Sequence, residues 1–277
     1  MGSESVPPAF VSVVITVKNE AKNLGALLES LVVQPAPFEV VLVDALSHDR
    51  TMAIAEDYAR KHPGVFRLFR KYGSRGIGRN EGVRQSSGAW VAFIDGACIA
   101  DSGWLEQIRL GFRDSRVVAG KTVSVGPAQY GQLSRVELFQ EGNDVTFPSC
   151  NLGYEKALFE SLGGFDPRFI TAEDIDLNLR AVQRGIHLRY VPEAIVYHSA
   201  RPTILRFLYQ AFWNGYGRKQ LTEKHGSLWG RYRIRRLLSG QRSVLAWARL
   251  AAAFGGYVAR VVTGGDKRLG PSGGAAS

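Results

Sequence analysis

The sequence is poor in the residues that mark metal clusters and disulfide-stabilised folds. Its two cysteines, Cys98 and Cys150, are the whole supply in 277 residues. Their separation fits no cysteine-based metal site, and two cysteines do not make a disulfide framework. We therefore expect a reducing compartment, with both thiols filling small spaces in the core.

Two targeting features are also missing. Residues 1–10 have neither a basic segment nor an apolar run, which predicts no secretory signal. The apolar stretch at residues 242–262 is interrupted by Arg249 and Arg260. These arginines break it below the roughly 18 residues that a membrane span needs, so we expect no spanning helix there.

Acidic residues are scarce only toward the end of the chain. Residues 224–277 contain ten Lys/Arg and one acid, Asp266, and so carry +9 of the net +10. A basic segment of this kind is typical of contact with anionic lipid or nucleic acid, or serves solubility. Because the rest of the chain is near neutral and no nucleic-acid-binding motif occurs, we expect no nucleic-acid partner.

Alternating strands and helices are what the first half does contain. Apolar runs predict strands at residues 10–17, 38–45, 65–70 and 89–96. Leucines spaced as on one helical face predict a helix after the first strand, at Leu24, Leu27, Leu28 and Leu31. This alternation predicts an α/β fold with a parallel sheet. Ligands bind at the carboxyl ends of such strands, where Asp44 and Asp95 lie.

The second half predicts a different order of elements. It begins with a strand at 119–126, whereas the first half also contains a glycine-rich loop at 73–82 that leads into a short helix. A helix is expected at 131–142, and another at 172–185, whose acidic first turn suits the helix dipole. Residues 187–198 predict two short strands broken at Pro192.

Five stretches together resemble a family 2 glycosyltransferase with the GT-A fold. They are VSVVITVKNEAKNLGALLESL (11–31), VVLVDALSHDRT (40–51), GRNEG (78–82) before GAWVAFIDGACIADSGWLE (88–106), GGFDPRFITAEDIDLNLRAVQRG (163–185) and VPEAIVYH (191–198). Each is weak alone, and their order makes the match specific. The resemblance implies a GT-A domain at 9–200, with a Rossmann-like nucleotide-binding half and a mixed sheet. Residues 201–263 would add a basic, amphipathic helical extension, and 264–277 a disordered tail.

The resemblance implies a donor site for a nucleotide sugar, either a UDP-sugar or a GDP-sugar. Its residues would be Thr16, Val17, Glu20, Asp44, Arg79, Asp95 and Gly96. Asp44 would accept a hydrogen bond from the base or ribose, and Arg79 would meet the base or diphosphate with its planar fork of donors. Each carboxylate taken alone is better explained as a helix cap or surface charge, and only their combination favours a site.

The resemblance further implies a divalent cation, Mg²⁺ or Mn²⁺, that neutralises the leaving diphosphate. Asp95 and His198 would be its ligands. The family's Asp-x-Asp motif reads Asp95-Gly96-Ala97 here, so a methyl group stands where the second carboxylate is expected. Either the site works with fewer protein ligands, or catalysis is weakened, or Ala97 is an engineered change.

The acceptor site implied by the resemblance lies at the start of the helix at 172–185. Asp174 would be the general base that takes a proton from the acceptor hydroxyl, and Glu173 would orient the acceptor. Asp176 is expected at the helix surface or behind the site. Acids that merely complement the helix dipole remain the alternative.

The resulting expectation is an inverting glycosyltransferase acting on a glycan or lipid-linked acceptor. Three alternatives stay open: a nucleotide-sugar-binding protein without turnover, a nucleotidyltransferase, and transfer to a polyprenyl phosphate. In the extension, Trp247, Leu250, Phe254, Val258 and Val261 share one helical face, opposite Arg242, Arg249 and Arg260. That pattern predicts peripheral contact with an anionic membrane surface, at the cytoplasmic face. A helix that seals the domain and a dimer contact are the alternatives.

Overall fold

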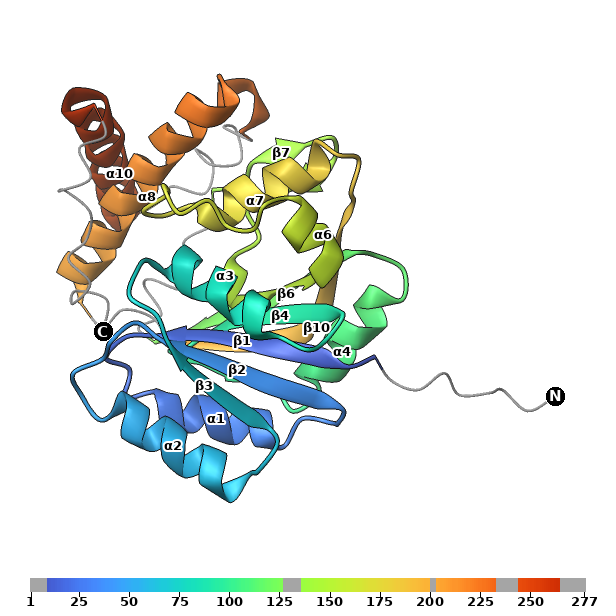
Figure 1. The fold of residues 1–277 in the computed structure, drawn as a ribbon. Coiled ribbons are helices and arrows are strands. Elements are labelled where there is room, and N and C mark those ends of the chain that lie inside the picture. The colour runs from blue at the N-terminus through green and yellow to red at the C-terminus, as the bar shows by residue number, and fades with distance from the viewer. Residues whose placement is uncertain (1–8, 127–135, 200–202, 233–243, 265–277) are drawn as a thin grey trace.

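A single mixed sheet organises the chain, whose computed structural model describes residues 9–126, 136–199, 203–232 and 244–264. The sheet has eight strands in the order β3-β2-β1-β4-β9-β6-β10-β5 (Figure 1). Its strands are β1 Val11–Val17, β2 Phe38–Asp44, β3 Phe66–Arg70, β4 Trp90–Asp95, β5 Cys98–Ala100, β6 Val117–Val125, β9 Leu152–Glu155 and β10 Leu188–Ser199. A separate pair consists of β7 Phe139–Gln140 and β8 Asn143–Asp144.

Helices cover both faces of the sheet. They are α1 Leu24–Val32, α2 Thr51–Lys61, α3 Arg75–Gln85, α4 Trp104–Phe112, α6 Lys156–Ser161, α7 Glu173–Val182, α8 Ile204–His225 and α10 Val244–Thr263, with 3-10 turns η1 Ser149–Asn151 and η2 Trp229–Arg231. Helices α1, α2 and α4 share one apolar core with the sheet, and α3, α6 and α7 contribute to the other. Within β1, Val13 and Ile15 enter the first core while Val14 enters the second. Burial on both faces explains why this strand reads as an unbroken apolar run.

Strand direction confirms the expected α/β fold with a mixed sheet. β1 pairs in parallel with β2 and β4, and β2 with β3. β9 is antiparallel to both β4 and β6, and β10 runs parallel to β6 but antiparallel to β5. The parallel strands therefore bring their carboxyl ends to one edge, where a nucleotide would bind.

Three local expectations are wrong. Residues 75–82 belong to helix α3, not to a loop. Gly78 and Gly82 are needed there because a Cβ would lie 2.8 Å and 2.4 Å from side-chain atoms of Thr16 and Val14. The part of 131–142 that the structure describes is extended, with positive φ at Glu141 and Gly142. β10 passes Pro192 as one strand, since a register shift between Val191 and Ile195 absorbs it.

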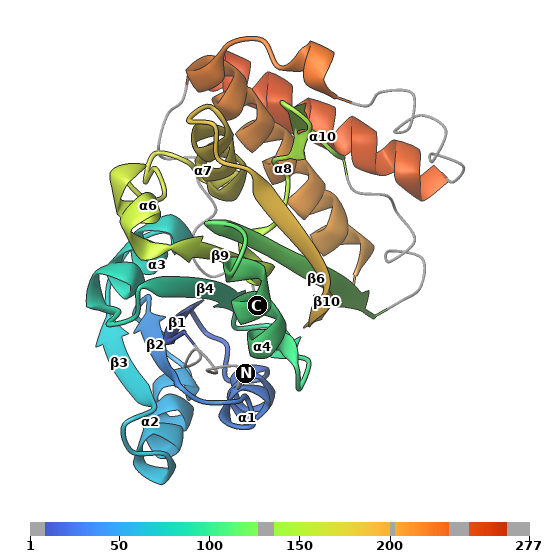
Figure 2. The same cartoon turned by 90° about the vertical axis from the view of Figure 1, so that its right-hand side faces the viewer.

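The helical extension is a pair of long helices packed side by side. α8 and α10 are adjacent in both views (Figures 1 and 2). Their backbones nearly touch, since a Cβ at Gly215 would lie 1.7 Å from the carbonyl oxygen of Ala253, and one at Gly256 would lie 1.8 Å from that of Phe212. The helix continues through Gly255 and Gly256. Contrary to expectation, α10 is long and apolar enough to cross a membrane by length and composition.

Candidate functional site at the carboxyl edge of the sheet

Strand register gathers the predicted donor residues. Thr16 lies opposite Asp95 across the β1–β4 pair, and Val17 lies opposite Asp44 across the β1–β2 pair. Gly96 packs so tightly that a Cβ there would lie 3.0 Å from Cγ of Glu20. Residues from three strand ends thus meet at one point, as their positions in the sequence predict.

Two loops beside these strand ends are fixed to each other by hydrogen bonds. The backbone N–H of Asn19 donates to Ser47 Oγ (2.8 Å), and that of Glu20 donates to Thr51 Oγ1 (2.8 Å). Asn19 and Leu46 have positive φ angles of 55° and 59°. Such backbone is disfavoured outside glycine and persists where surrounding contacts enforce it, so this rim of the site is preorganised.

Asp44 lies deeper than a ligand-facing carboxylate would. Its side chain is 0% exposed, and it accepts hydrogen bonds from the backbone N–H (3.1 Å) and hydroxyl (2.5 Å) of Ser47. The guanidinium of Arg70 lies 3.5 Å away and is itself mostly exposed. In this structure Asp44 therefore anchors the 45–49 turn.

Arg79 joins the end of β4 to the start of α7. Its guanidinium is 2% exposed and donates to Asp95 Oδ1 (2.6 Å) and to Glu173 Oε1 (2.8 Å). Burial acts to raise the pKa of Asp95, yet the charges of Arg79 and Arg75 hold that pKa below its usual value. The same two carboxylates raise the pKa of Arg79, against the effect of its burial. Sequence reasoning named all three residues but not this bridge.

Asp174 combines two backbone hydrogen bonds with a raised pKa. Its carboxylate accepts from the backbone N–H of Ser149 (3.0 Å) and from that of Ile175 (2.9 Å). Burial and the neighbouring charge of Glu173 raise the pKa of Asp174, which outweighs these hydrogen bonds and the attraction of Arg79. A carboxylate whose pKa moves toward neutrality is a stronger proton acceptor. Ser149 was missed, because nothing in its local sequence shows that η1 meets α7.

The backbone before Asp174 is strained. Ala172 precedes α7 with φ 65° and ψ 20°, in the left-handed region. Its neighbour Thr171 abuts α8, where a Cβ at Gly217 would lie 2.7 Å from the Thr171 carbonyl oxygen. Tight packing of α8 thus enforces an unfavourable turn that aims Glu173 and Asp174 at the site.

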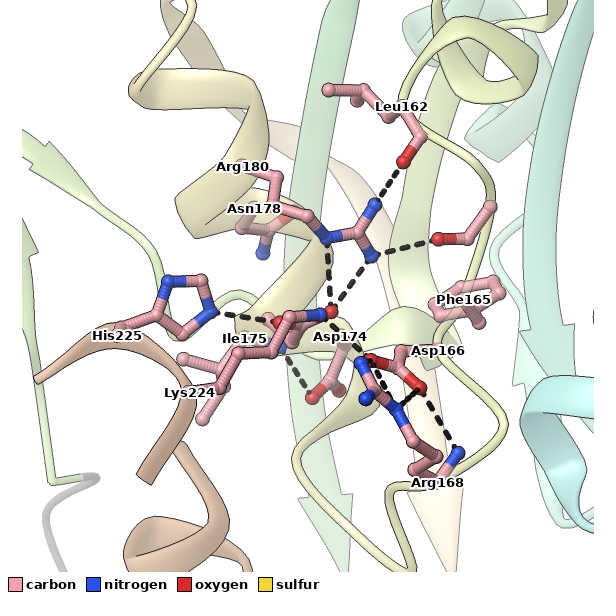
Figure 3. A network of polar contacts seen from close by, with 12 residues as sticks. Leu162, Phe165, Asp166, Arg168, Asp174, Ile175, Asn178, Arg180, Lys224 and His225 are labelled. Atoms are coloured by element: carbon pink, nitrogen blue, oxygen red, sulfur yellow. Dashed lines mark hydrogen bonds and ion pairs between the residues drawn. The ribbon is translucent and has the colours of Figure 1, made fainter. Parts of the chain in front are cut away.

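Asp176 is the centre of an ion network, whose partners Arg180, Lys224 and His225 are drawn in Figure 3. It is fully buried and contacts Nζ of Lys224 (2.7 Å), Nε2 of His225 (2.8 Å) and the guanidinium of Arg180 (2.7 Å). Burial opposes ionisation, but these three groups lower the pKa of Asp176. Lys224 also contacts Asp166 (2.8 Å). Asp176 is therefore a buried link from α7 to α8 and not a charge at the helix surface, and a role behind the site stays a prediction.

The two predicted metal ligands come close at the end of β10. His198 pairs with Cys98 in the β10–β5 register, and its charge helps to lower the pKa of Asp95. The carbonyl of Ala97 accepts a hydrogen bond from the backbone N–H of Ser199, the residue after His198 (3.0 Å). Within the part of the chain that the structure describes, no group of three His, Cys, Asp or Glu side chains could hold a metal. The residues fit a cation only if substrate phosphate and water complete its coordination, as Mg²⁺ commonly requires.

An α/β fold with polar residues gathered at the carboxyl ends of its parallel strands is typical of enzymes that bind a ligand at that edge. Residues 12–154 match the model for glycosyl transferase family 2, and residues 135–264 match that for glycosyl transferase family group 2. The chain is 30% identical over 207 residues to glycosyltransferase AglE of Haloferax volcanii, covering 70% of this chain and 68% of that one. The chain belongs to glycosyltransferase family 2.

Other relatives agree. The pre-mycofactocin glycosyltransferase of Mycobacterium tuberculosis is 31% identical over 223 residues, which are 74% of this chain but 46% of that one. This chain therefore spans about half of that relative. Two solved structures share the GT-A fold: a Pyrobaculum calidifontis mannosyltransferase with GDP-Man and Mn²⁺ (TM-score 0.64, 18% identity, 93% of this chain and 76% of that one), and Staphylococcus aureus TarS with UDP-GlcNAc (TM-score 0.58, 18% identity, 92% of each).

Proposed function

We propose that the chain transfers a sugar, with inversion, from a UDP-sugar or GDP-sugar to a hydroxyl group of a glycan or lipid-linked acceptor. The observation that carries this proposal is the Asp95–Arg79–Glu173 bridge. Arg79 pairs with Asp95, which we expect to face the donor, and with Glu173, which we expect to face the acceptor, and its charge also acts on the adjacent Asp174. Family membership supports the reaction class.

The bond changes follow from these positions. Asp174 takes the proton of the acceptor hydroxyl, and the oxygen of that hydroxyl bonds to the anomeric carbon of the donor sugar. The bond from that carbon to the phosphate oxygen breaks on the opposite face, and the nucleoside diphosphate leaves. Glu173 would orient the acceptor, while the charge of Arg79 favours the ionised form of Asp95. Contact of Arg79 with the base or diphosphate stays a prediction.

Donor binding would use the rim of the site. Thr16, Val17, Glu20 and Gly96 would line the nucleotide pocket, and Asp44 would support the turn beside it. Asp95 and His198 would hold Mg²⁺ or Mn²⁺ together with the diphosphate. When bound, this cation would stabilise the charge of the leaving diphosphate. The Mn²⁺ of the structural relative from Pyrobaculum supports a divalent cation.

Asp174→Asn tests the proposal. With radiolabelled UDP-sugars and GDP-sugars and a membrane extract as acceptor source, we expect a loss of kcat of about 10²-fold or more, because proton transfer contributes that much. Affinity for the nucleoside diphosphate should remain. Asp57→Asn, an exposed carboxylate on α2, is the control and should keep full activity.

Two alternatives have their own outcomes. Full activity in Asp174→Asn favours a polyprenyl phosphate acceptor, which is already ionised and needs no base. Nucleotide binding without turnover, and without any gain from Ala97→Asp, favours a binding protein. Sugar transfer under none of these conditions contradicts the proposed activity. We place the reaction in the cytoplasm, which suits the two free, buried thiols.

A further inference from the structure

Helix α10 is amphipathic, but its apolar face points away from the protein, which is the opposite of what is expected for a helix that faces water. Its outward face is apolar and exposes Val244, Trp247, Phe254, Val258, Val261 and Val262. Its arginines turn the other way: Arg260 contacts Glu223 of α8 (2.7 Å) and stacks on the ring of Tyr216, and burial lowers the pKa of Arg249. In a surface helix the apolar stripe normally faces the protein core. An exposed apolar surface of this kind marks a site of interaction with a partner outside the domain.

The start of α8 continues the apolar surface. Ile204, Leu205 and Tyr209 are exposed at its first turns. This part of α8 follows β10 closely in the chain, a few residues after the predicted metal ligand His198. The apolar surface therefore begins beside the carboxyl edge of the sheet and extends along α10, which lies outermost against α8 in Figure 1.

The charge distribution indicates which partner covers the apolar surface of α8 and α10. Residues 201–277 contain fourteen Lys/Arg and two acids, whereas residues 1–200 contain 21 Lys/Arg and 23 acids. The net positive charge of the protein thus belongs to the segment that carries the apolar surface. An apolar helix face with Trp247 on it, within a strongly basic segment, matches an anionic lipid surface, which attracts both parts. A second copy of the chain would bring like charges together.

Helix α8 also contacts the acceptor motif, by which we mean the segment 163–185 that contains Glu173 and Asp174. Gly217 packs on Thr171, and the side chain of Gln220 accepts from the Ile170 N–H (3.2 Å) and donates to the Arg168 carbonyl (3.0 Å). Lys224 reaches Asp176 on α7. These contacts fix the segment that precedes Glu173 and Asp174 to the helix that carries the apolar surface.

We propose that α10 and the start of α8 dock on an anionic bilayer and so hold the acceptor motif at the lipid surface, where it meets a lipid-linked acceptor. Because α10 is packed along α8 at Gly215 and Gly256, it lies in the plane of the membrane and does not cross it. The docking does not depend on the proposed function, but the identity of the acceptor does.

Cosedimentation with vesicles tests the docking. The full chain should bind vesicles that contain phosphatidylglycerol and bind pure phosphatidylcholine weakly, with high salt reducing the difference. The double variant Trp247→Asp/Phe254→Asp should bind at least about tenfold less, since two large apolar anchors are lost from the interface. Val33→Asp on α1 is the matched control, because Val33 is 62% exposed, comparable to Trp247 (56%) and Phe254 (67%). It should bind as the parent does.

Equal vesicle binding by the double variant overturns the proposal. So does a parent chain that ignores the vesicles and forms a dimer that the double variant loses, measured by light scattering, because the cover is then a second copy. Calorimetric binding of the nucleoside diphosphate by the double variant shows that it is folded. If docking holds but a water-soluble glycan is glycosylated as fast as a lipid-linked one, the acceptor part alone fails. Absence of all transfer with docking intact counts against the proposed function only.

Discussion

At the scale of single residues, Arg79 sets the charge balance of the site. Arg79→Gln leaves Asp95 and Glu173 facing each other without the buried cation between them. Breaking a buried pair in this way costs about 3–5 kcal/mol, so we expect that loss in the free energy of unfolding, measured with urea. Arg84→Gln on the same helix removes a cation that is 67% exposed, and its denaturation midpoint should match the parent's. Equal midpoints for all three proteins would show that the bridge contributes nothing.

The raised pKa of Asp174 gives the reaction a pH signature. Only the ionised carboxylate accepts the proton, so activity is present above its pKa and is lost as the pH falls through it. Because burial and Glu173 raise that pKa, the acid limb of the kcat profile should lie above the ordinary carboxylate value of about 4. Glu173→Gln removes the neighbouring charge and should shift this limb toward lower pH. A limb that does not move would mean that another group titrates.

Residue identities were more predictable than residue partners. The strand-end positions of Asp44 and Asp95 and the helix start at Asp174 follow from local patterns. Partners such as Ser149 for Asp174 depend on contacts between segments 25 residues apart, which no local pattern encodes. The burial of Asp44 also escaped prediction, because it depends on hydrogen bonds from Ser47 in the turn that follows the strand.

At the scale of elements, glycines decide whether α8 and α10 stay together. Gly215→Val places a side chain where a single Cβ would lie 1.7 Å from the Ala253 carbonyl oxygen, so the helices must separate. We expect α10 to become the first site cut in limited proteolysis, while nucleotide binding persists. Gly255→Ala is the matched control, since its Cβ would lie 4.0 Å from Phe212, and Ala favours a helix by up to about 1 kcal/mol over Gly. Unchanged cleavage in Gly215→Val would contradict the role of this contact.

Contacts with α8 also explain why α10 is one continuous helix. In the sequence, Gly255 and Gly256 lower helix propensity and Arg249 and Arg260 interrupt the apolar run. In the structure Gly256 allows close packing on α8, and Arg260 is paired with Glu223, so both residues support a continuous helix. Tertiary contacts of this kind override local propensity. The strand at Pro192 survives for a related reason, because a register shift accommodates the proline.

At the scale of the whole molecule, the α/β class and the position of the site followed from the sequence, and the path of the sheet did not. Alternating strands and helices give parallel β1 to β4 directly. The antiparallel insertion of β9 between β4 and β6 depends on long-range pairing. That insertion brings η1 beside the site, since η1 immediately precedes β9. The predicted disordered tail at 264–277 lies almost wholly outside the residues that the structure describes.

The central claim is that this edge of the sheet binds a nucleoside diphosphate with a divalent cation despite Ala97. Calorimetric titration of UDP and GDP, with and without Mn²⁺, tests it most directly. We predict that one diphosphate binds, that Mn²⁺ tightens its binding, and that Asp95→Asn removes the gain from Mn²⁺. Binding that Mn²⁺ leaves unchanged would contradict the metal site, and no binding of either nucleotide would contradict the nucleotide-sugar donor itself.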